Sequence, residues 1–314
     1  LKSRGPGPPP CAPRARAAPC RPRSMPPLNV LVTGAGGRTG AMALKKMAAQ
    51  KELFNARGTA RTETSAATIR KETGAECGLC DITKPESIEK ALTGVEVLTI
   101  LSSATPKPNW FKLLGFFVRK LCGCGKNSHM GEAFEYPPGG MPEKVDWEGQ
   151  RNLITAAQKA GVQHVILVSS MGGTQIGHFL NKMGDGNILL WKRKAEKFLM
   201  SSGIPYTIIH PGGLLPHRGN KVVPGGERKL VVGVDDELMS RDAKHRCIPR
   251  EDVAEVVVKC ALCPEAKGRS FDLVSDPPST DGQGVWDGDM KALLATLDGK
   301  NCDYAIPSHE ILGE

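Results

Sequence analysis

The stretch Leu28–Gly40, with the sequence LNVLVTGAGGRTG, decides the fold of this chain. Its first part, Leu28–Thr33, is a short apolar run of the kind that forms a strand buried on both faces. Glycines follow the strand, and a helical pattern begins at Thr39. A glycine-rich loop between a buried strand and a helix is typical of dinucleotide sites, so the stretch predicts a phosphate-binding loop.

The spacing of this loop is G-x-x-G-x-x-G, and each glycine has a physical use. Gly34 permits a tight turn, Gly37 lets the backbone approach a pyrophosphate, and Gly40 allows the helix to pack closely on the strand. The helix N-terminus adds free N–H groups and the positive end of the helix dipole. We therefore expect the cofactor to contact Gly34, Gly36, Gly37, Arg38, Thr39 and Gly40.

Strand and helix patterns alternate along the chain after this loop. Further strands are predicted at Phe54–Ala60, Ala75–Cys80, Val95–Leu101, His164–Ser169 and Tyr206–His210. Helices are predicted at Thr39–Gln50, Glu63–Glu72, Glu86–Leu92, Val145–Ala160 and Gly186–Ser202. The alternation implies βαβ crossovers, and hence an α/β fold with a Rossmann-type, doubly wound parallel sheet.

The alternation loosens after Pro211. Short strands are expected near Lys229–Val234 and Ser270–Val274, and helices at Arg250–Cys263 and Asp287–Leu297. This part is interpreted as a small C-terminal lobe, from about residue 211, over the edge of the sheet. Residues 25–314 are thus expected to form one NAD(P)-binding domain with this lobe and an insertion at residues 104–142.

The positive charge of the chain is concentrated at its start. Of the net charge of +9, residues 1–24 contribute six basic residues and no acid, which leaves +3 for residues 25–314. A nearly balanced folded part argues against nucleic acid as a partner. No run of about 18 apolar residues occurs, so no transmembrane segment is predicted.

Residues 1–24 are rich in Pro, Arg and Ala and are predicted to be a disordered leader. Transit peptides share this Arg-rich, acid-poor character, which favours a chloroplast location in the stroma. The alternative is a translated upstream stretch, with Met25 as the initiator and a cytoplasmic protein.

The residue type at the end of the second strand indicates whether the protein binds NADP or NAD. An Asp or Glu there would bind the ribose 2′-hydroxyl and repel a 2′-phosphate. The chain has Thr59-Ala60-Arg61-Thr62 instead, and Arg61 can form a charge-assisted fork with the phosphate. Arg38 can approach from the glycine loop. The cofactor is therefore predicted to be NADP(H).

Two further contacts are expected from position alone. Asp81, after the third strand, either accepts from the adenine amino group or caps the following turn. Ser102 and Ser103, after the fourth strand, are expected beneath the cofactor ribose.

Four motifs together carry a resemblance to a known family: TGAGGRTG at residues 33–40, VDWEGQ at 145–150, VSSMGG at 168–173 and GNILLWKRKAE at 186–196. They resemble the atypical short-chain dehydrogenase/reductases, including the NmrA-like branch, and in particular a chloroplast NAD(P)-binding subgroup of plants and algae. The resemblance spans about Leu28–Val274. It implies a Rossmann fold and NADP binding, and it names no substrate.

The resemblance also assigns roles at the ends of the later strands. Ser170 and Lys192 match the family's catalytic Ser and Lys, with Lys192 as a ribose contact. Ile188 stands where the family has its proton-transferring Tyr. Pro211 and Gly212 lie where the family loop passes the nicotinamide. His210 is either a replacement acid or a structural hydrogen-bonding residue.

The insertion carries Trp110, Phe111, Phe116 and Phe117 among basic residues. A helix at Trp110–Leu121 can pack on the core, cover a substrate pocket or touch a membrane surface. Two functional hypotheses follow. The protein is an NADPH-dependent reductase of an unknown small carbonyl or quinone substrate, or it is a non-catalytic NADP(H) sensor or scaffold whose insertion binds a protein partner.

The chain has ten cysteines, including the pairs Cys77–Cys80 and Cys260–Cys263. Zinc knuckles present such pairs on tight turns, whereas these pairs fall in a predicted strand and at the end of a predicted helix. We therefore expect buried free thiols and no metal site, while a regulatory disulfide stays open.

Overall fold

The computed structural model describes residues 26–122, 129–216, 222–279 and 283–305, so the predicted leader lies outside the described residues. Within these ranges ten strands form one sheet. They are β1 (Leu28–Thr33), β2 (Phe54–Ala60), β3 (Glu76–Leu79), β4 (Val97–Ile100), β7 (His164–Val168), β8 (Tyr206–Pro211), β9 (Gly213–Leu215), β10 (Leu230–Gly233), β11 (Cys247–Pro249) and β12 (Arg269–Ser275).

The strand order is β3-β2-β1-β4-β7-β8-β12-β11-β9, and β10 pairs with β12. The strands from β3 to β12 along this order are parallel, with Val30 facing Ala56 on β2 and Val97 on β4. The chain moves outward from β1 to β3 and then returns to the other side of β1 as β4. This reversal opens a crevice at the carboxyl ends of β1 and β4, where doubly wound sheets bind ligands. The Rossmann-type prediction is confirmed.

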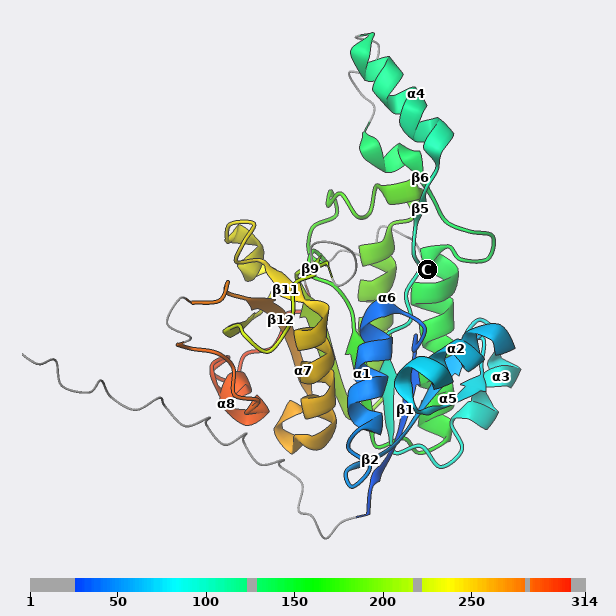
Figure 1. Cartoon of the computed structure of the whole chain (residues 1–314), viewed down its shortest axis with the longest axis vertical. Helices are drawn as coiled ribbons and strands as arrows, with labels where there is room; N and C mark the ends of the chain where they lie inside the picture. Colours follow the sequence, from blue (N-terminus) through cyan, green and yellow to red (C-terminus); the bar gives the residue numbers. More distant parts are fainter. Residues whose placement is uncertain (1–25, 123–128, 217–221, 280–282, 306–314) are drawn as a thin grey trace, which may run out of the picture.

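Helices cover both faces of the sheet (Figure 1). The helices of the sheet layers are α1 (Arg38–Ala48), α2 (Glu63–Thr73), α3 (Pro85–Ala91), α5 (Gln150–Lys159), α6 (Ile188–Ser201) and α7 (Arg250–Leu262), and a short α8 (Met290–Ala295) follows β12. Helix α1 packs beside α2 and α7, while α5 packs beside α3 and α6. The apolar strands between these layers are buried, because parallel sheets are covered on both sides.

The predicted helix Val145–Ala160 is confirmed as helical, but it is not a single α-helix. A π-helix spans Glu143–Gly149 and continues into α5. A β-carbon on Gly149 would lie 2.8 Å from the side chain of Ile82. The last turn of the π-helix therefore packs directly against Ile82. The π-helix also carries Asp146, which is completely buried and accepts a hydrogen bond from the amide of Ala104. These long-range contacts outweigh the local preference for an α-helix.

The segment after Pro211 continues the same sheet. Strand β12 pairs in parallel with β8, and β10 and β11 pair with β12 in the antiparallel direction. The residues assigned to a C-terminal lobe are therefore joined to the main sheet by main-chain hydrogen bonds.

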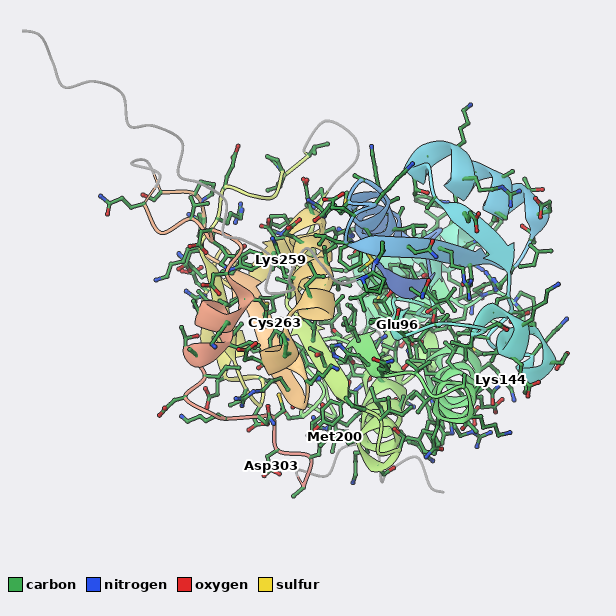
Figure 2. The ribbon with its side chains drawn as sticks, turned by 90° about the horizontal axis from the view of Figure 1, so that it is seen from below. Glu96, Lys144, Met200, Lys259, Cys263 and Asp303 are labelled. Atoms are coloured by element: carbon green, nitrogen blue, oxygen red, sulfur yellow. The ribbon has the colours of Figure 1, made fainter. Side chains whose placement is uncertain are left out.

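Glu96 links strands at the amino end of the sheet, and Figure 2 labels it near the centre of the view. The carboxylate of Glu96 accepts from the amide and the side chain of Asn29, each at 3.0 Å. The carbonyl of Glu96 accepts from the amide of His164 at the start of β7. These bonds fix the amino ends of β1, β4 and β7 and leave the opposite end available for a site.

The insertion holds α4 (Trp110–Leu121) and the two-stranded ribbon of β5 (Lys107–Pro108) and β6 (Phe134–Glu135). Figure 1 shows α4 projecting away from the body of the protein. Only Phe116 of the four predicted aromatic residues is buried, so the core-packing alternative fails for Trp110, Phe111 and Phe117.

Gly58 on β2 lies directly beneath α1. A β-carbon there would lie 2.7 Å from the side chain of Leu44 and 2.9 Å from that of Ala35. Gly78 on the adjacent strand β3 has no atom within 4 Å of such a carbon. Packing therefore requires a glycine at position 58 but not at position 78, so the two positions can be compared directly.

We expect Gly58→Ala to lower the free energy of unfolding by about 1–3 kcal/mol, because the added methyl group overpacks the interface between α1 and the sheet. Urea unfolding followed by circular dichroism measures this change. Gly78→Ala is the control and should be neutral or slightly stabilising. Equal effects of the two substitutions would contradict the packing argument.

Candidate functional site

The glycine loop brings three main-chain segments into direct contact. Gly34 has φ +69°, and a β-carbon on it would lie 2.5 Å from the carbonyl carbon of Leu101. A β-carbon on Gly40 would lie 2.2 Å from the carbonyl oxygen of Gly34. The amide of Gly37 donates to this same oxygen at 2.8 Å. The start of α1 therefore lies against the carboxyl ends of β1 and β4.

The N-terminus of α1 has the form of an anion-binding site. Gly37 is the N-cap, and no side chain caps the helix. Gly36, Gly37 and Arg38 are exposed, so the amides of the first turn are accessible to a ligand. Free helix N–H groups with the positive end of the dipole favour a phosphate group. The residues of this loop fit a dinucleotide pyrophosphate.

Three guanidinium groups belong to the same end of the sheet. Arg38 follows the glycine loop and Arg61 follows β2, and both are exposed. Arg250, the first residue of α7, donates to the carbonyl of Leu214, and its pKa is lowered by burial and by the positive charge of Arg38. The sequence did not indicate Arg250 as a residue near the glycine loop, because only the packing of α7 beside α1 places it there.

The other residues predicted to contact the cofactor already have protein partners. The carboxylate of Asp81 accepts from the amide and hydroxyl of Thr83, at 3.1 and 2.8 Å, so it caps its turn as the second alternative proposed. Ser102 is half-buried with its hydroxyl 3.5 Å from that of Thr33, and Ser103 is exposed.

The loop after β8 is likewise fixed by the protein itself. Pro211 is buried at the end of β8, and its carbonyl accepts from the amide of Met171. A β-carbon on Gly212 would lie 2.2 Å from the carbonyl oxygen of Arg246, which explains the glycine without a ligand.

Lys192 forms a buried ion pair with Asp146. The distance from Nζ to Oδ1 is 2.7 Å, and the side chains are 7% and 0% exposed. The second carboxylate oxygen of Asp146 accepts from the amide of Ala104 at 2.9 Å. Lys192 on α6 is thereby tied to the loop after β4. A lone buried charge is very unfavourable, so each partner holds the other in place.

A tyrosine from the insertion packs near Ile188, the position at which the family has its proton-transferring tyrosine. Ile188 forms a small apolar cluster with Ala104 and Leu189, and Tyr136 packs against this cluster. The hydroxyl of Tyr136 is buried without a hydrogen-bond partner in the described structure. Burial, followed by the charge of Asp146, raises the pKa of Tyr136 to about 12. The sequence did not indicate this residue, because no lysine follows it at the family spacing.

Ser170 lies after β7, beside a cavity large enough for one water molecule. Its hydroxyl donates to the carbonyl of Met171 at 3.0 Å. The cavity has a volume of about 10 Å³, and Ser170, His210, Asp272 and Cys302 are among its lining residues. Ser169 donates instead to Glu196.

His210 is buried between two carboxylates. Its Nε2 lies 3.1 Å from Glu196, and its Nδ1 lies 3.5 Å from Asp272. Burial opposes the charged imidazole, but Glu196 and Asp272 outweigh it and raise the pKa of His210 well above its usual value. A side chain enclosed in this way matches the structural alternative for His210 better than the catalytic one.

A larger cavity of about 530 Å³ lies beside α4. Lys112, Arg119, Glu132, Tyr136 and Asp185 are among its lining residues, and the glycine loop does not contribute to it.

The thiols of Cys77, Cys80 and Cys260 are buried and free, as predicted. Burial raises the pKa of each of them, which keeps the thiols protonated.

The sheet order, the reversal at β1 and the glycine loop define the class of Rossmann-fold dinucleotide-binding proteins. The family model described as NAD(P)H-binding matches residues 34–264. The chain belongs to this NAD(P)H-binding family.

Two relatives match most of the chain. A chloroplastic protein of Arabidopsis thaliana is 45% identical over 87% of this chain and 77% of its own length. Sanguinarine reductase of Eschscholzia californica is 41% identical over 86% of this chain and 96% of its own length. An oxidoreductase of Lactococcus lactis has the same fold, with a TM-score of 0.58 and 19% identity over 87% of this chain and 98% of that chain.

Across the described ranges, the helices are too short or too polar to cross a lipid bilayer.

Proposed function

We propose that this protein is an NADPH-dependent reductase of a small carbonyl or quinone compound. The observation that carries the proposal is the meeting of Tyr136, Asp146 and Lys192 beside the loop that follows β4. This arrangement supplies a lysine and a phenol next to the dinucleotide crevice, although Ile188 replaces the family tyrosine. The likeness to sanguinarine reductase supports a reductase over a sensor.

When bound, NADPH supplies a hydride for the electrophilic carbon of the substrate. The glycine loop and the first turn of α1 would hold the pyrophosphate through main-chain amides. Lys192, with its ammonium group oriented by Asp146, would hold the nicotinamide ribose. Ser170 orients the substrate oxygen through its hydroxyl.

Tyr136 donates the proton that the reduced substrate oxygen requires. A phenol with a pKa of about 12 is protonated at neutral pH, so Tyr136 starts in the form that can donate. The O–H bond of Tyr136 breaks as the new O–H bond of the product forms, and solvent then restores the proton.

The preference for NADPH over NADH rests on charge at the end of β2. Ala60 ends the strand, and Arg61 follows it without a carboxylate that would repel a 2′-phosphate. Arg38 and Arg250 add positive charge near the same loop.

We expect Arg61→Ser to weaken NADPH binding roughly 10- to 100-fold and to leave NADH binding unchanged, because only NADPH carries the 2′-phosphate. Titration calorimetry with both cofactors measures the two dissociation constants. Lys71→Ser removes an exposed cation from the neighbouring helix α2 and is the control. Equal affinity of the unaltered protein for NADH and NADPH would refute the preference.

We expect Tyr136→Phe to lower kcat by roughly 100-fold or more, since general acids contribute about 10²–10⁴-fold, and to leave the affinity for NADPH unchanged. NADPH oxidation with a panel of aldehydes, ketones and quinones gives the rates. Tyr206→Phe, at a half-buried tyrosine on β8, is the control. No turnover with any acceptor, despite NADPH binding, would favour the sensor hypothesis.

A second function is supported by the exposed stripe of α4. Its apolar side chains repeat at helical spacing and are between 52% and 89% exposed; they are Trp110, Phe111, Leu114, Phe117, Val118 and Leu121. A soluble protein seldom exposes such a continuous face without a partner.

We propose that this stripe docks on an anionic lipid surface. Helix α4 contains no acidic residue, and Arg119 and Lys120 lie in its last turn. Aromatic and aliphatic residues next to cations are typical of helices that lie in a membrane interface. A protein partner with an apolar groove is the other occupant that the stripe can fit.

We expect the triple variant Phe111→Ser, Leu114→Ser, Leu121→Ser to lose about 100-fold or more in affinity for vesicles containing anionic lipid, because burial of each side chain is worth about 1.5–3 kcal/mol. Vesicle sedimentation measures binding, and neutral vesicles should bind more weakly.

The control for this experiment changes three exposed apolar residues away from α4: Leu79, Ile176 and Val222. This control should bind like the unaltered protein. If the unaltered protein binds neither kind of vesicle, the lipid proposal fails and the protein partner becomes the better hypothesis.

We also propose a location in the chloroplast stroma, based on the Arg-rich leader and on the Arabidopsis relative named chloroplastic. Import of the labelled full chain into isolated chloroplasts, followed by fractionation, tests the location. Failure of import would favour the cytoplasmic alternative with Met25 as the initiator.

A further inference from the structure

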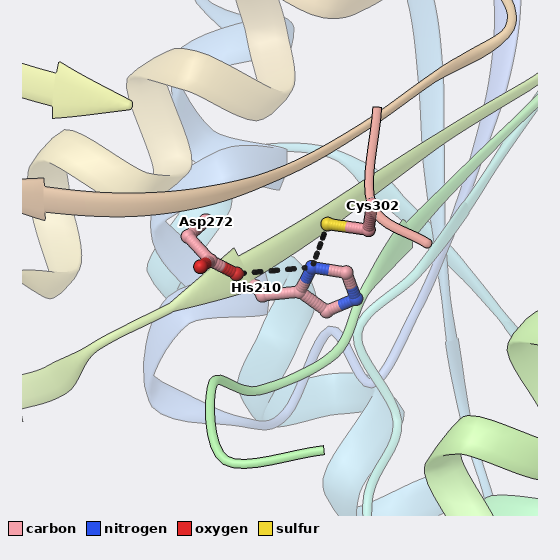
Figure 3. Close-up of side chains that lie close together, drawn as sticks. All are labelled: His210, Asp272 and Cys302. Atoms are coloured by element: carbon pink, nitrogen blue, oxygen red, sulfur yellow. Dashed lines mark hydrogen bonds and ion pairs between the residues drawn. The ribbon is translucent and has the colours of Figure 1, made fainter. Parts of the chain in front are cut away.

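Three potential metal ligands from separate parts of the chain meet inside the protein (Figure 3). They are His210 on β8, Asp272 on β12 and Cys302 after α8. All three side chains are buried, and one ligand atom of each lies within 4.8 Å of the others. The group combines nitrogen, oxygen and sulfur donors, the set that Zn²⁺ uses in proteins.

Two distances within this cluster are compatible with ligands around one metal ion, and the one between Nδ1 and Sγ is also that of a hydrogen bond to sulfur. His210 Nδ1 lies 3.5 Å from Asp272 Oδ1 and 3.6 Å from Cys302 Sγ. A charge-assisted N–H···O bond would be about 2.7–2.9 Å long. By contrast, metal–ligand bonds of about 2.0–2.3 Å in a tetrahedron place neighbouring ligand atoms roughly 3.3–3.7 Å apart.

Neighbouring groups orient the ligands in the way that zinc sites require. Nε2 of His210 lies 3.1 Å from Glu196, so a proton on Nε2 is held there and the lone pair of Nδ1 is directed to the cluster. Oδ2 of Asp272 accepts from the amide of Asp236 at 2.7 Å, which leaves Oδ1 for a cation. A carboxylate behind a histidine ligand is the usual arrangement around bound zinc.

The surroundings also favour a cation. Glu196, Asp236 and Asp272 are buried in this region, and the basic side chains buried beside them are Arg193 and His210. The cavity of about 10 Å³ next to the cluster is bordered by all three ligands. Its volume corresponds to one water molecule, which can complete a fourfold coordination.

We propose that His210, Asp272 and Cys302 bind one Zn²⁺ ion, with a water molecule as the fourth ligand. Binding displaces the Cys302 thiol proton, and any proton on His210 Nδ1, to solvent as the Zn–S and Zn–N bonds form. The ion joins β8, β12 and the segment that follows α8. Ser170, which the proposed reductase uses, borders the cavity beside this cluster, whereas Tyr136 and Lys192 do not.

The test uses the full chain purified without chelators. Elemental analysis should give one zinc per chain. Replacement by Co²⁺ should produce the near-ultraviolet band of a cobalt–thiolate bond, which reports sulfur ligation directly. Cys302→Ser should remove this band and weaken metal binding at least 100-fold. Cys260→Ser, at a buried cysteine outside the cluster, is the matched control and should keep both.

Two results would overturn the proposal: a purified chain that binds neither Zn²⁺ nor Co²⁺ stoichiometrically, or a Cys302→Ser variant that keeps the thiolate band. The second result would assign the metal to other cysteines. If Cys302→Ser does not fold, X-ray absorption of the zinc-loaded, unaltered protein decides the question. One sulfur with two or three nitrogen or oxygen ligands supports the site, and two or more sulfurs refute it.

Discussion

The contact between Gly34 and Gly40 is the constraint on which the site depends. The main chain at the end of β1, the start of α1 and the end of β4 lie so close together that neither glycine has room for a β-carbon. This contact directs the N-terminus of α1 at the crevice where the strand order reverses. A phosphate group placed there meets main-chain amides, so cofactor binding needs few specific side chains.

A tyrosine from the insertion packs beside Ile188, the residue that stands where the resemblance expects the family tyrosine. Ile188 occupies the tyrosine position, and Tyr136 packs against the same apolar cluster from a distant part of the chain. The π-helix turns Asp146 inward, where it pairs with Lys192 and binds the amide of Ala104. One buried ion pair therefore links the start of the insertion to α6, and it fixes the groups that surround the crevice.

A second buried polar network joins α6 to the three adjacent strands β7, β8 and β12. Glu196 on α6 contacts Ser169 after β7 and His210 on β8, and His210 in turn faces Asp272 on β12. Groups of this kind are costly to bury unless they are paired, so the network requires β12 to lie beside β8. It also explains why the lysine-rich motif on α6 ends in a glutamate that points into the protein.

The sequence by itself determined the elements whose signals are local. The bounds of β1, β2 and α4 agree with the apolar periodicity, and the glycine loop was recognised from its place between a strand and a helix. The tertiary structure alone decided the π-helix, the partners of Lys192 and His210, and the approach of Tyr136 and Arg250. Periodicity describes neighbours along the chain, whereas these contacts join residues brought together only when the helices and strands pack.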